Sequence, residues 1–230
     1  MVNTISIIIP TQNEAASIGK LIAYLQLHGK DNVAEIIISD GGSTDETLAI
    51  AAQSGATVLT APLKSRAAQM NYGAAKASGD ILYFVHADSC PPKSFAADVI
   101  EAVNKGFDFG RYRTKFDSSK LLLKINAWFT RFNWFICYGG DQTMFITRNF
   151  FQQSGGFKNE LLIMEEYEFC EKQMKQGHYK IFGDTALISA RKYEGRSWLQ
   201  VQLANRKAVQ LYKKGASQEE IVKTYKQMLG

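Results

Sequence analysis

His86 and Asp88 are the residues whose types and placing first suggest chemistry, because they follow an unbroken apolar run at residues 81–85. Five successive apolar residues predict a strand that is buried on both faces, as in a parallel sheet covered by helices. Ligands of open α/β sheets bind outside the carboxyl ends of the strands, so an imidazole and a carboxylate placed there would face a ligand site. A lone aspartate at a strand end can also do no more than cap the next turn.

The strand before His86 is one of four apolar runs that alternate with helical patterns in the first 90 residues. The other three runs lie at 5–9, 36–39 and 57–60, and an alanine-rich helix is predicted from Arg66 to residue 77. This β-α-β-α order predicts an α/β fold with a doubly wound, mostly parallel sheet that is flanked by helices and joined by right-handed crossovers.

Two polar loops are expected to begin helices. Asn13 would cap the first helix, with Glu14 in its first turn, where a carboxylate suits the positive end of the helix dipole. Ser43 and Glu46 have the spacing of a capping box for a second helix that ends near Gly55.

The second half of the chain has a less regular pattern. It predicts an alternating strand at 107–116 and helices at 94–104, 164–177, 197–214 and, behind a capping box at Ser217, 217–229. Residues 118–135 form an amphipathic pattern with a stripe made of Leu121, Ile125, Trp128, Phe132 and Phe135. We expect this stripe to pack on the core, as most helical stripes do. A basic, aromatic helix can alternatively lie on a membrane surface.

Length and composition favour a single domain over residues 1–230, with 46% hydrophobic residues to build its core. Three cysteines, without metal-ligand spacing and odd in number, argue against a disulfide framework. The N-terminus has no signal-peptide pattern, and no uncharged apolar stretch reaches about 18 residues. We therefore expect a cytoplasmic protein without a membrane span.

The net charge of +5 is concentrated near the C-terminus, where residues 191–230 hold nine Lys or Arg against three Glu. A basic end suits an anionic substrate, a membrane surface or a nucleic acid, or it is simply the solvated face of helices. These cations lack the interleaved aromatic residues of a base-stacking surface, so a nucleic acid is not expected as a partner.

The first 90 residues have the outline of a nucleotide-binding fold but contain neither the G-x-G-x-x-G nor the G-x-x-x-x-G-K-[ST] motif. Seven other motifs, in their order along the chain, resemble those of family 2 glycosyltransferases, most closely a bacterial subgroup of short, soluble members. They are SIIIPTQNE (6–14), SDGGSTDET (39–47), RAAQMNYGA (66–74), HAD (86–88), GDQ (140–142), GGF (155–157) and MEEYEF (164–169). The resemblance covers about residues 4–195. It implies a GT-A fold, a nucleotide-diphosphosugar donor, a divalent metal ion and inversion at the anomeric carbon.

The resemblance also divides the chain by role. It implies a nucleotide-binding half at 1–92 and an acceptor and catalytic half at 93–195. The C-terminal helices at 196–230 are predicted from the sequence pattern alone. A UDP-sugar is the expected donor. The positions that match the family's donor contacts are Pro10, Thr11, Glu14 and Asp40 for the base and ribose, Arg66 near the phosphates, and Ala87 and Asp88 beside the sugar nucleotide.

Asp88 matches the last aspartate of the family's D-x-D motif, which implies a hard oxygen ligand for Mn²⁺ or Mg²⁺ on the donor diphosphate. His86 stands where many members carry aspartate. Imidazole suits Mn²⁺ better than Mg²⁺, so this departure favours manganese, with His86 as a second candidate ligand.

Glu165 and Glu166 match the family's E-D motif, whose aspartate resembles the general base that deprotonates the acceptor hydroxyl. The candidates for the base are therefore Glu166, then Glu165, then Asp141. Arg191 and Lys192 resemble a basic segment that closes over the phosphates or holds an anionic acceptor. Their alternative interpretation is solvated surface.

The resemblance therefore implies a metal-dependent, inverting glycosyltransferase. The sequence does not identify the acceptor, and the basic C-terminal end and residues 128–135 suggest the hypothesis of an anionic or lipid-linked one with peripheral membrane contact. Two alternatives stay open. A degenerate, non-catalytic nucleotide-sugar-binding protein is suggested by His86 and Glu166, which both stand where the family carries aspartate. A sugar nucleotidyltransferase would need a glycine-rich loop with a basic residue after the first strand, and residues 10–13 offer none.

Overall fold

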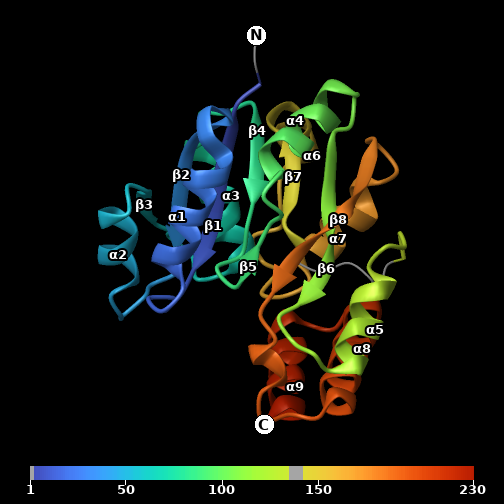
Figure 1. Cartoon of the computed structure of the whole chain (residues 1–230). Helices are drawn as coiled ribbons and strands as arrows, with labels where there is room; N and C mark the ends of the chain where they lie inside the picture. The colour runs from blue at the N-terminus through green and yellow to red at the C-terminus, as the bar shows by residue number, and fades with distance from the viewer. Residues whose placement is uncertain (1–2, 135–141) are drawn as a thin grey trace.

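The structure is a computed structural model that describes residues 3–134 and 142–230. Four strands of the first half pair in parallel, namely β1 (Ile5–Thr11), β2 (Val33–Asp40), β3 (Thr57–Thr60) and β4 (Ile81–Phe84) (Figure 1). The four predicted strands are confirmed. β1 and β2 continue past their apolar runs to Thr11 and Asp40, which are register partners in the ladder.

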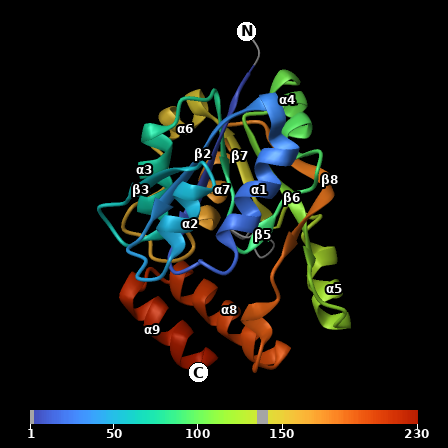
Figure 2. The same cartoon turned by 60° about the vertical axis from the view of Figure 1, so that its left-hand side comes forward.

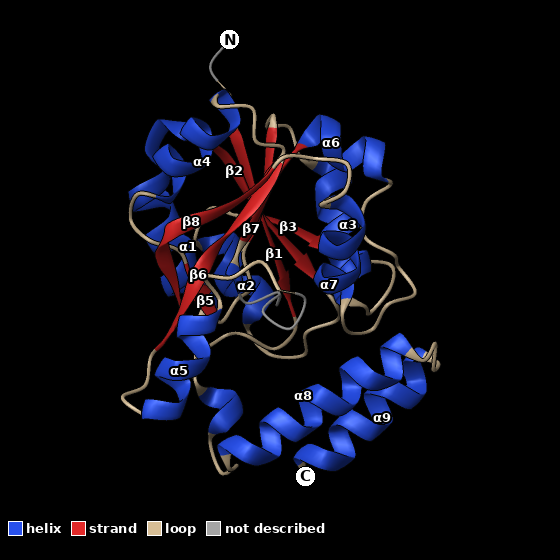
Figure 3. Ribbon diagram, turned by 90° about the vertical axis from the view of Figure 1, so that its right-hand side faces the viewer, coloured by secondary structure: helices blue, strands red, loops and turns tan. Residues whose placement is uncertain are grey.

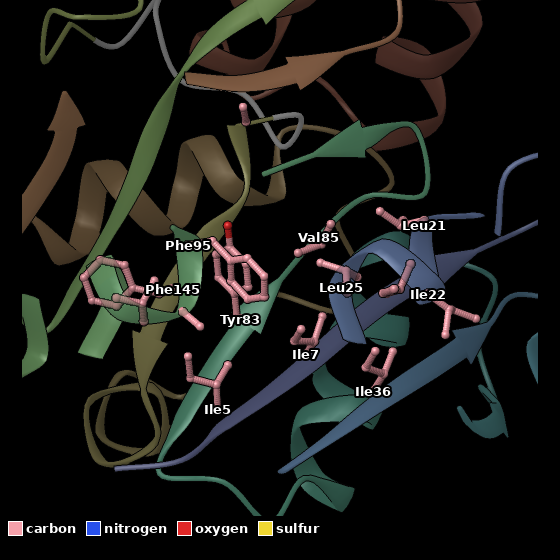
Figure 4. Close-up of a cluster of buried hydrophobic side chains, with 14 of the residues drawn as sticks. Ile5, Ile7, Leu21, Ile22, Leu25, Ile36, Tyr83, Val85, Phe95 and Phe145 are labelled. Carbon is pink, nitrogen blue, oxygen red and sulfur yellow. The ribbon is translucent and has the colours of Figure 1, made fainter. Parts of the chain in front are cut away.

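Helices cover both faces of these strands, namely α1 (Ile18–Gly29), α2 (Thr47–Gln53), α3 (Arg66–Lys76) and α4 (Phe95–Asn104). Successive side chains of a strand point to opposite faces, so β1 contributes to two cores. Ile5 and Ile7 pack with Leu25 of α1 and Phe95 of α4 (Figure 4), whereas Ile8 packs with α3 on the other face. Burial on both faces explains the unbroken apolar run.

The second half adds β5 (Ser89–Cys90), β6 (Phe109–Phe116), β7 (Met144–Thr147) and β8 (Tyr179–Ile188). The strand order of the resulting sheet is β3-β2-β1-β4-β7-β6-β8-β5. β7 is antiparallel to both β4 and β6, and β8 is parallel to β6, so β6 and β8 run in the same direction as β4. The carboxyl ends of β1, β2, β4, β6 and β8 therefore face one edge of the sheet, at the bottom of Figure 1.

Two of the predicted helix starts are wrong. α1 begins at Ile18 and not at Asn13, whose φ of 55° is left-handed and whose side chain instead accepts from the backbone N–H of Thr44 at 2.8 Å. α2 begins at Thr47, and Ser43 donates its hydroxyl to Asp40 and accepts from the backbone N–H of Asn13 at 2.8 Å. Both residues hold the two loops to each other, a tertiary role that competes with capping.

The remaining helices are α5 (Leu121–Phe129), α6 (Arg148–Ser154), α7 (Glu165–Gln173), α8 (Trp198–Lys213) and α9 (Gln218–Leu229), with short 3₁₀ turns η1 (Lys30–Asn32) and η4 (Arg191–Tyr193). The Ser217 cap is confirmed, because its hydroxyl accepts from the backbone N–H of Glu220 at 3.2 Å. Helices α8 and α9 pack together beyond the carboxyl edge of the sheet (Figures 2 and 3). Within the described ranges, no helix has the length and apolarity to cross a membrane.

The core interpretation of the apolar stripe is wrong for its three members on α5, while Phe132 is half-buried against Trp128 and Trp134. Leu121 is 69% exposed, Ile125 42% and Trp128 48%, whereas Leu123 is the buried side chain of α5. Leu123 packs with Tyr193 and Val201, so the helix is attached to the protein through the face opposite to the expected one. Phe135 lies outside the described residues.

Candidate active site

Asp40 is the centre of a hydrogen-bonded loop at the carboxyl ends of β1 and β2. It is fully buried, and its carboxylate accepts from the backbone N–H groups of Gly42 at 2.7 Å and Ser43 at 2.8 Å. The hydroxyls of Ser43 and, at 3.3 Å, Thr11 complete four contacts. A carboxylate has about four lone-pair sites, so the loop already fills those of Asp40. A nucleotide base would therefore compete with a protein donor for this carboxylate.

Gln69 of α3 contacts this loop and is a residue that the sequence interpretation missed. Its side-chain amide donates to the carbonyl of Thr11 at 2.7 Å and to that of Ser39 at 3.0 Å, so it connects the ends of β1 and β2. A side chain at Gly41 would meet this amide at 2.7 Å, which explains the glycine there. The sequence signal that could have identified Gln69 is a polar residue among the buried alanines of this helix.

His86 and Glu166 form a buried pair between the end of β4 and the first turn of α7. Nε2 of His86 lies 2.9 Å from Oε1 of Glu166, and both side chains are almost entirely buried. Met164, at φ 75°, turns the chain into α7, whose positive dipole end faces the glutamates. Burial raises the pKa of Glu166, but the hydrogen bond and charge of His86 outweigh it, so the pKa is lowered and the carboxylate is favoured.

The pKa of Glu165 is shifted in the opposite direction, toward the protonated form. It is fully buried, and one oxygen lies 3.3 Å from the guanidinium of Arg66 at the start of α3. Burial, followed by the charge of Glu166, raises the pKa of Glu165 to about 7, although Arg66 and His86 oppose the rise. Two adjacent carboxyl groups with pKa values pushed apart are typical of acid and base pairs in active sites.

Asp88 belongs to a second group of charges at the same edge. Arg191, in η4, donates to Glu14 at 2.6 Å and 3.0 Å and to Asp88 at 3.3 Å. The hydrogen bond from Arg191 to Glu14, together with the charge of Asp88, raises the pKa of the guanidinium further. The guanidinium of Arg191, which follows β8, thus connects Glu14, which follows β1, with Asp88, which follows β4.

The remaining predicted site residues fall into different places. Pro10 and Ala87 are buried beside the loop and the His86 turn. Lys192 points toward α8 and α9, donating to Asn205 at 3.2 Å and lying 5.2 Å from the ring of Tyr225. Asp141 lies outside the described residues.

A divalent cation that a protein holds by itself needs several ligand side chains close together. Within residues 3–134 and 142–230 there is no group of three or more His, Cys, Asp or Glu side chains that could hold a metal by themselves. Asp88 nevertheless offers a partly exposed carboxylate. Mg²⁺ and similar ions often bind through one or two carboxylates together with substrate phosphates, so Asp88 fits such a shared site. His86 directs Nε2 at Glu166, and its assignment as a ligand stays a prediction.

The family model of glycosyl transferase family 2 matches residues 6–158, which include the loops of β1 and β2 and the His86 turn. The chain belongs to glycosyl transferase family 2. A curated relative, an uncharacterized glycosyltransferase of Rickettsia felis, is 34% identical over 108 residues, 47% of this chain. That match spans 36% of the relative's own length.

Solved structures of other glycosyltransferases share the fold. A mannosyltransferase from Pyrobaculum calidifontis, in complex with GDP-Man and Mn²⁺, has a TM-score of 0.68 at 15% identity, over 89% of this chain and 61% of that one. Glucosyl-3-phosphoglycerate synthase from Mycobacterium tuberculosis, in complex with Mn²⁺, UDP-Glc and phosphoglyceric acid, has a TM-score of 0.62 at 17% identity, over 93% and 80%. The predicted GT-A fold is confirmed for this family 2 chain.

Proposed function

We propose that this chain transfers a sugar from a nucleotide-diphosphosugar to an acceptor hydroxyl, with inversion at the anomeric carbon. The observation that carries the proposal is the junction of two segments. Residues 86–88, which hold the candidate metal ligand, meet residues 165–166, which hold the candidate base, through the 2.9 Å contact of His86 and Glu166. A donor phosphate near Asp88 and an acceptor near Glu166 would lie on either side of one reacting carbon.

Glu166 is proposed as the base. Its ionised form is favoured by His86, and a general base must be in that form to accept a proton. The acceptor proton passes to the Glu166 carboxylate as the acceptor oxygen forms its bond to the anomeric carbon. The bond from that carbon to the diphosphate oxygen breaks, and the nucleoside diphosphate leaves. Glu165 and Asp141 stay second and third candidates.

Asp88 would hold a divalent metal ion together with the donor phosphates, with His86 as a candidate second ligand. Such an ion supplies neutralisation of the charge that develops on the leaving diphosphate. Arg191 is proposed to add a permanent cation to the same phosphates, since it already contacts the carboxylate of Asp88. The Mn²⁺ in both described neighbours supports a divalent metal ion, and the Mycobacterium tuberculosis synthase is also solved with Mg²⁺ and UDP. Mn²⁺ is preferred here because imidazole suits it better, if His86 is a ligand.

A UDP-sugar is the proposed donor, with Pro10, Thr11, Glu14 and Asp40 around its base and ribose, Arg66 near its phosphates, and Ala87 beside it. The UDP-Glc of the Mycobacterium tuberculosis synthase supports a uridine nucleotide, whereas the GDP-Man of the Pyrobaculum calidifontis enzyme is the alternative. The base N–H would have to replace one of the four donors to Asp40. The hydroxyl of Thr11 is the simplest one to replace, because it makes the longest of the four contacts, at 3.3 Å, and can rotate.

The acceptor is proposed to be anionic or lipid-linked and held by Arg191, which Lys192 would join only by leaving its contact with Asn205. The protein is proposed to act in the cytoplasm as one domain. The phosphoglyceric acid bound to the Mycobacterium tuberculosis synthase supports an anionic acceptor. A non-catalytic nucleotide-sugar-binding protein is the second candidate, since Glu165 and Glu166 are both buried. Donor binding without any transfer would favour that candidate.

The test is thermal stabilisation by nucleoside diphosphates and their sugars, each with Mn²⁺, Mg²⁺ or EDTA, on wild type, Asp88→Ala and an exposed control, Asp31→Ala. A ligand present at about 100 times its Kd stabilises the protein by about 2.7 kcal/mol, which gives a measurable shift in Tm. We expect a uridine diphosphate to stabilise wild type and Asp31→Ala only with metal, and Asp88→Ala not at all. If no nucleotide shifts the Tm of wild type, the donor site is wrongly assigned.

A further inference from the structure

The segment from Leu121 to Trp134 has more exposed large hydrophobic side chains than any other stretch of similar length in the described chain. It contributes six of the twelve exposed large hydrophobic side chains, namely Leu121, Leu122, Ile125, Trp128, Phe129 and Trp134. The other six are distributed over several distant elements. Contiguous exposed apolar surface of this kind marks an interaction site.

The aromatic members of this segment pack on one another and so form a preformed ridge. Phe132 stacks on Trp134 with ring centroids 4.6 Å apart and meets Trp128 edge-on at 5.1 Å. Trp128 also meets Phe129 at 5.2 Å, and the guanidinium of Arg131 lies 4.5 Å from the ring of Trp128. We call residues 121–134 the aromatic ridge.

A basic pocket lies beside the ridge, between β6, α5 and β8. It has a volume of about 290 Å³ and is lined by four cations, Arg113, Lys115, Lys124 and Arg131, and by no acidic side chain. None of these four takes part in an ion pair within the described part of the chain. Residues 111–134 hold six Lys or Arg against one Asp, so the positive charge is a property of the whole segment.

Cations around exposed tryptophans complement an anionic bilayer better than another protein. Interfaces between proteins are depleted of charge at their centre, whereas tryptophan with lysine and arginine is the usual composition of the membrane interface. The aromatic rings can enter the boundary of headgroups and acyl chains while the cations contact the phosphates. We infer that the aromatic ridge and its basic pocket dock this protein on the surface of an anionic lipid bilayer.

The position of the ridge gives this docking a consequence for the site. α5 follows β6, whose direction is that of β4, so α5 leaves the sheet at the edge where Asp88 and Glu166 lie (Figures 1 and 3). A bilayer bound at α5 would bring a lipid-linked acceptor to the correct edge. The docking itself does not depend on the proposed sugar transfer, because it uses none of the proposed donor or catalytic residues.

Two of the three tryptophans of the chain belong to the ridge, so tryptophan emission reports its insertion directly. The test titrates the protein at low salt with vesicles of phosphatidylcholine alone and of equimolar phosphatidylcholine and phosphatidylglycerol, using flotation and emission. Trp198→Phe removes the third emitter. We expect binding and a blue shift with the anionic vesicles only, and release at about 1 M salt, where charges are screened beyond about 3 Å.

Two variants localise the binding. Lys124→Gln with Arg131→Gln should weaken it about 25-fold, since each basic residue near an anionic surface contributes about fivefold. The control, Lys223→Gln with Lys226→Gln, removes the same charge from exposed positions of α9 and should bind as wild type does. Circular dichroism is to be used to check that each variant is folded.

Four results would overturn the inference. The first three are no vesicle binding at low salt, equal weakening in the α9 control, and self-association through the ridge in place of vesicle binding. Glycerol 3-phosphate in excess should not release the protein, because the rings contribute to binding. Release by glycerol 3-phosphate alone would show that the pocket binds a free phosphate ligand. This fourth result would overturn the proposal of bilayer docking. These vesicle measurements can be interpreted even if the nucleotide test fails, because vesicle binding does not require a donor site.

Discussion

We expect wild type to lose stability as pH rises, because the buried carboxyl of Glu165 must then ionise. Glu165→Gln should remove this loss. Glu165 is fully buried, lies beside Glu166 and contacts Arg66 at 3.3 Å. Burial and the charge of Glu166 raise its pKa from 4.5 to about 7, against the opposing effects of Arg66 and His86. Glutamine has nearly the same shape and no charge to desolvate.

The size and sign follow from this difference in pKa. A carboxyl group whose pKa is higher in the folded chain contributes its full stability below the unfolded value of 4.5 and loses it as pH rises through the folded value near 7. One pKa unit corresponds to about 1.4 kcal/mol. The free energy of unfolding of wild type should therefore fall by about 2 to 3 kcal/mol between about pH 5 and about pH 8 through this group.

The assay is urea unfolding of wild type, Glu165→Gln and Glu171→Gln at both pH values. Glu171 is an exposed glutamate of the same helix, α7, and serves as the matched control. The free energy of unfolding of Glu165→Gln, relative to wild type, should rise by the stated amount from the lower to the higher pH. An equal difference at both pH values would refute the claim that burial disfavours the charged form of Glu165.

Three further predictions concern single side chains. Glu166→Gln should lower kcat by about 10²- to 10⁴-fold with donor binding retained, measured by transfer kinetics and Tm shifts; unchanged kcat would move the base to another residue. Arg111→Met should lower the free energy of unfolding, measured by urea unfolding, by about 2 to 5 kcal/mol. The reason is that the buried guanidinium donates to the carbonyls of Thr130 at 2.8 Å and Phe132 at 3.2 Å. Gly79→Ala should cost about 1 to 3 kcal/mol in urea unfolding, because its Cβ would lie 2.7 Å from a backbone nitrogen of β1, whereas Gly183→Ala, with open space around it, should be neutral.

Much of the first half of the fold could be predicted from its sequence. The apolar runs of β1 and β4 and the alanine-rich segment of α3 each indicate the type of one element, because the local residue types carry that information. The helix starts at Asn13 and Ser43 could not be predicted in the same way. Both side chains have a local capping partner and a distant loop partner, and only the folded chain selects between them.

The candidate site divides along the same line. The residue types and their order in the chain by themselves identified the chemical groups, His86, Asp88, Glu165 and Glu166, and their resemblance to a family. Which carboxylate meets His86, and which meets Arg66, depends on α7 lying against the end of β4, a contact between residues about 80 positions apart.

The aromatic stripe of α5 shows the limit most clearly. Its periodicity determined that one face of a helix is apolar, and the sequence carried that information completely. Whether protein covers that face depends on where the rest of the chain packs, and in the folded protein Leu123 takes the core contact while Trp128 stays exposed. Local spacing encodes the amphipathicity of an element, whereas the tertiary structure alone decides what its apolar face meets.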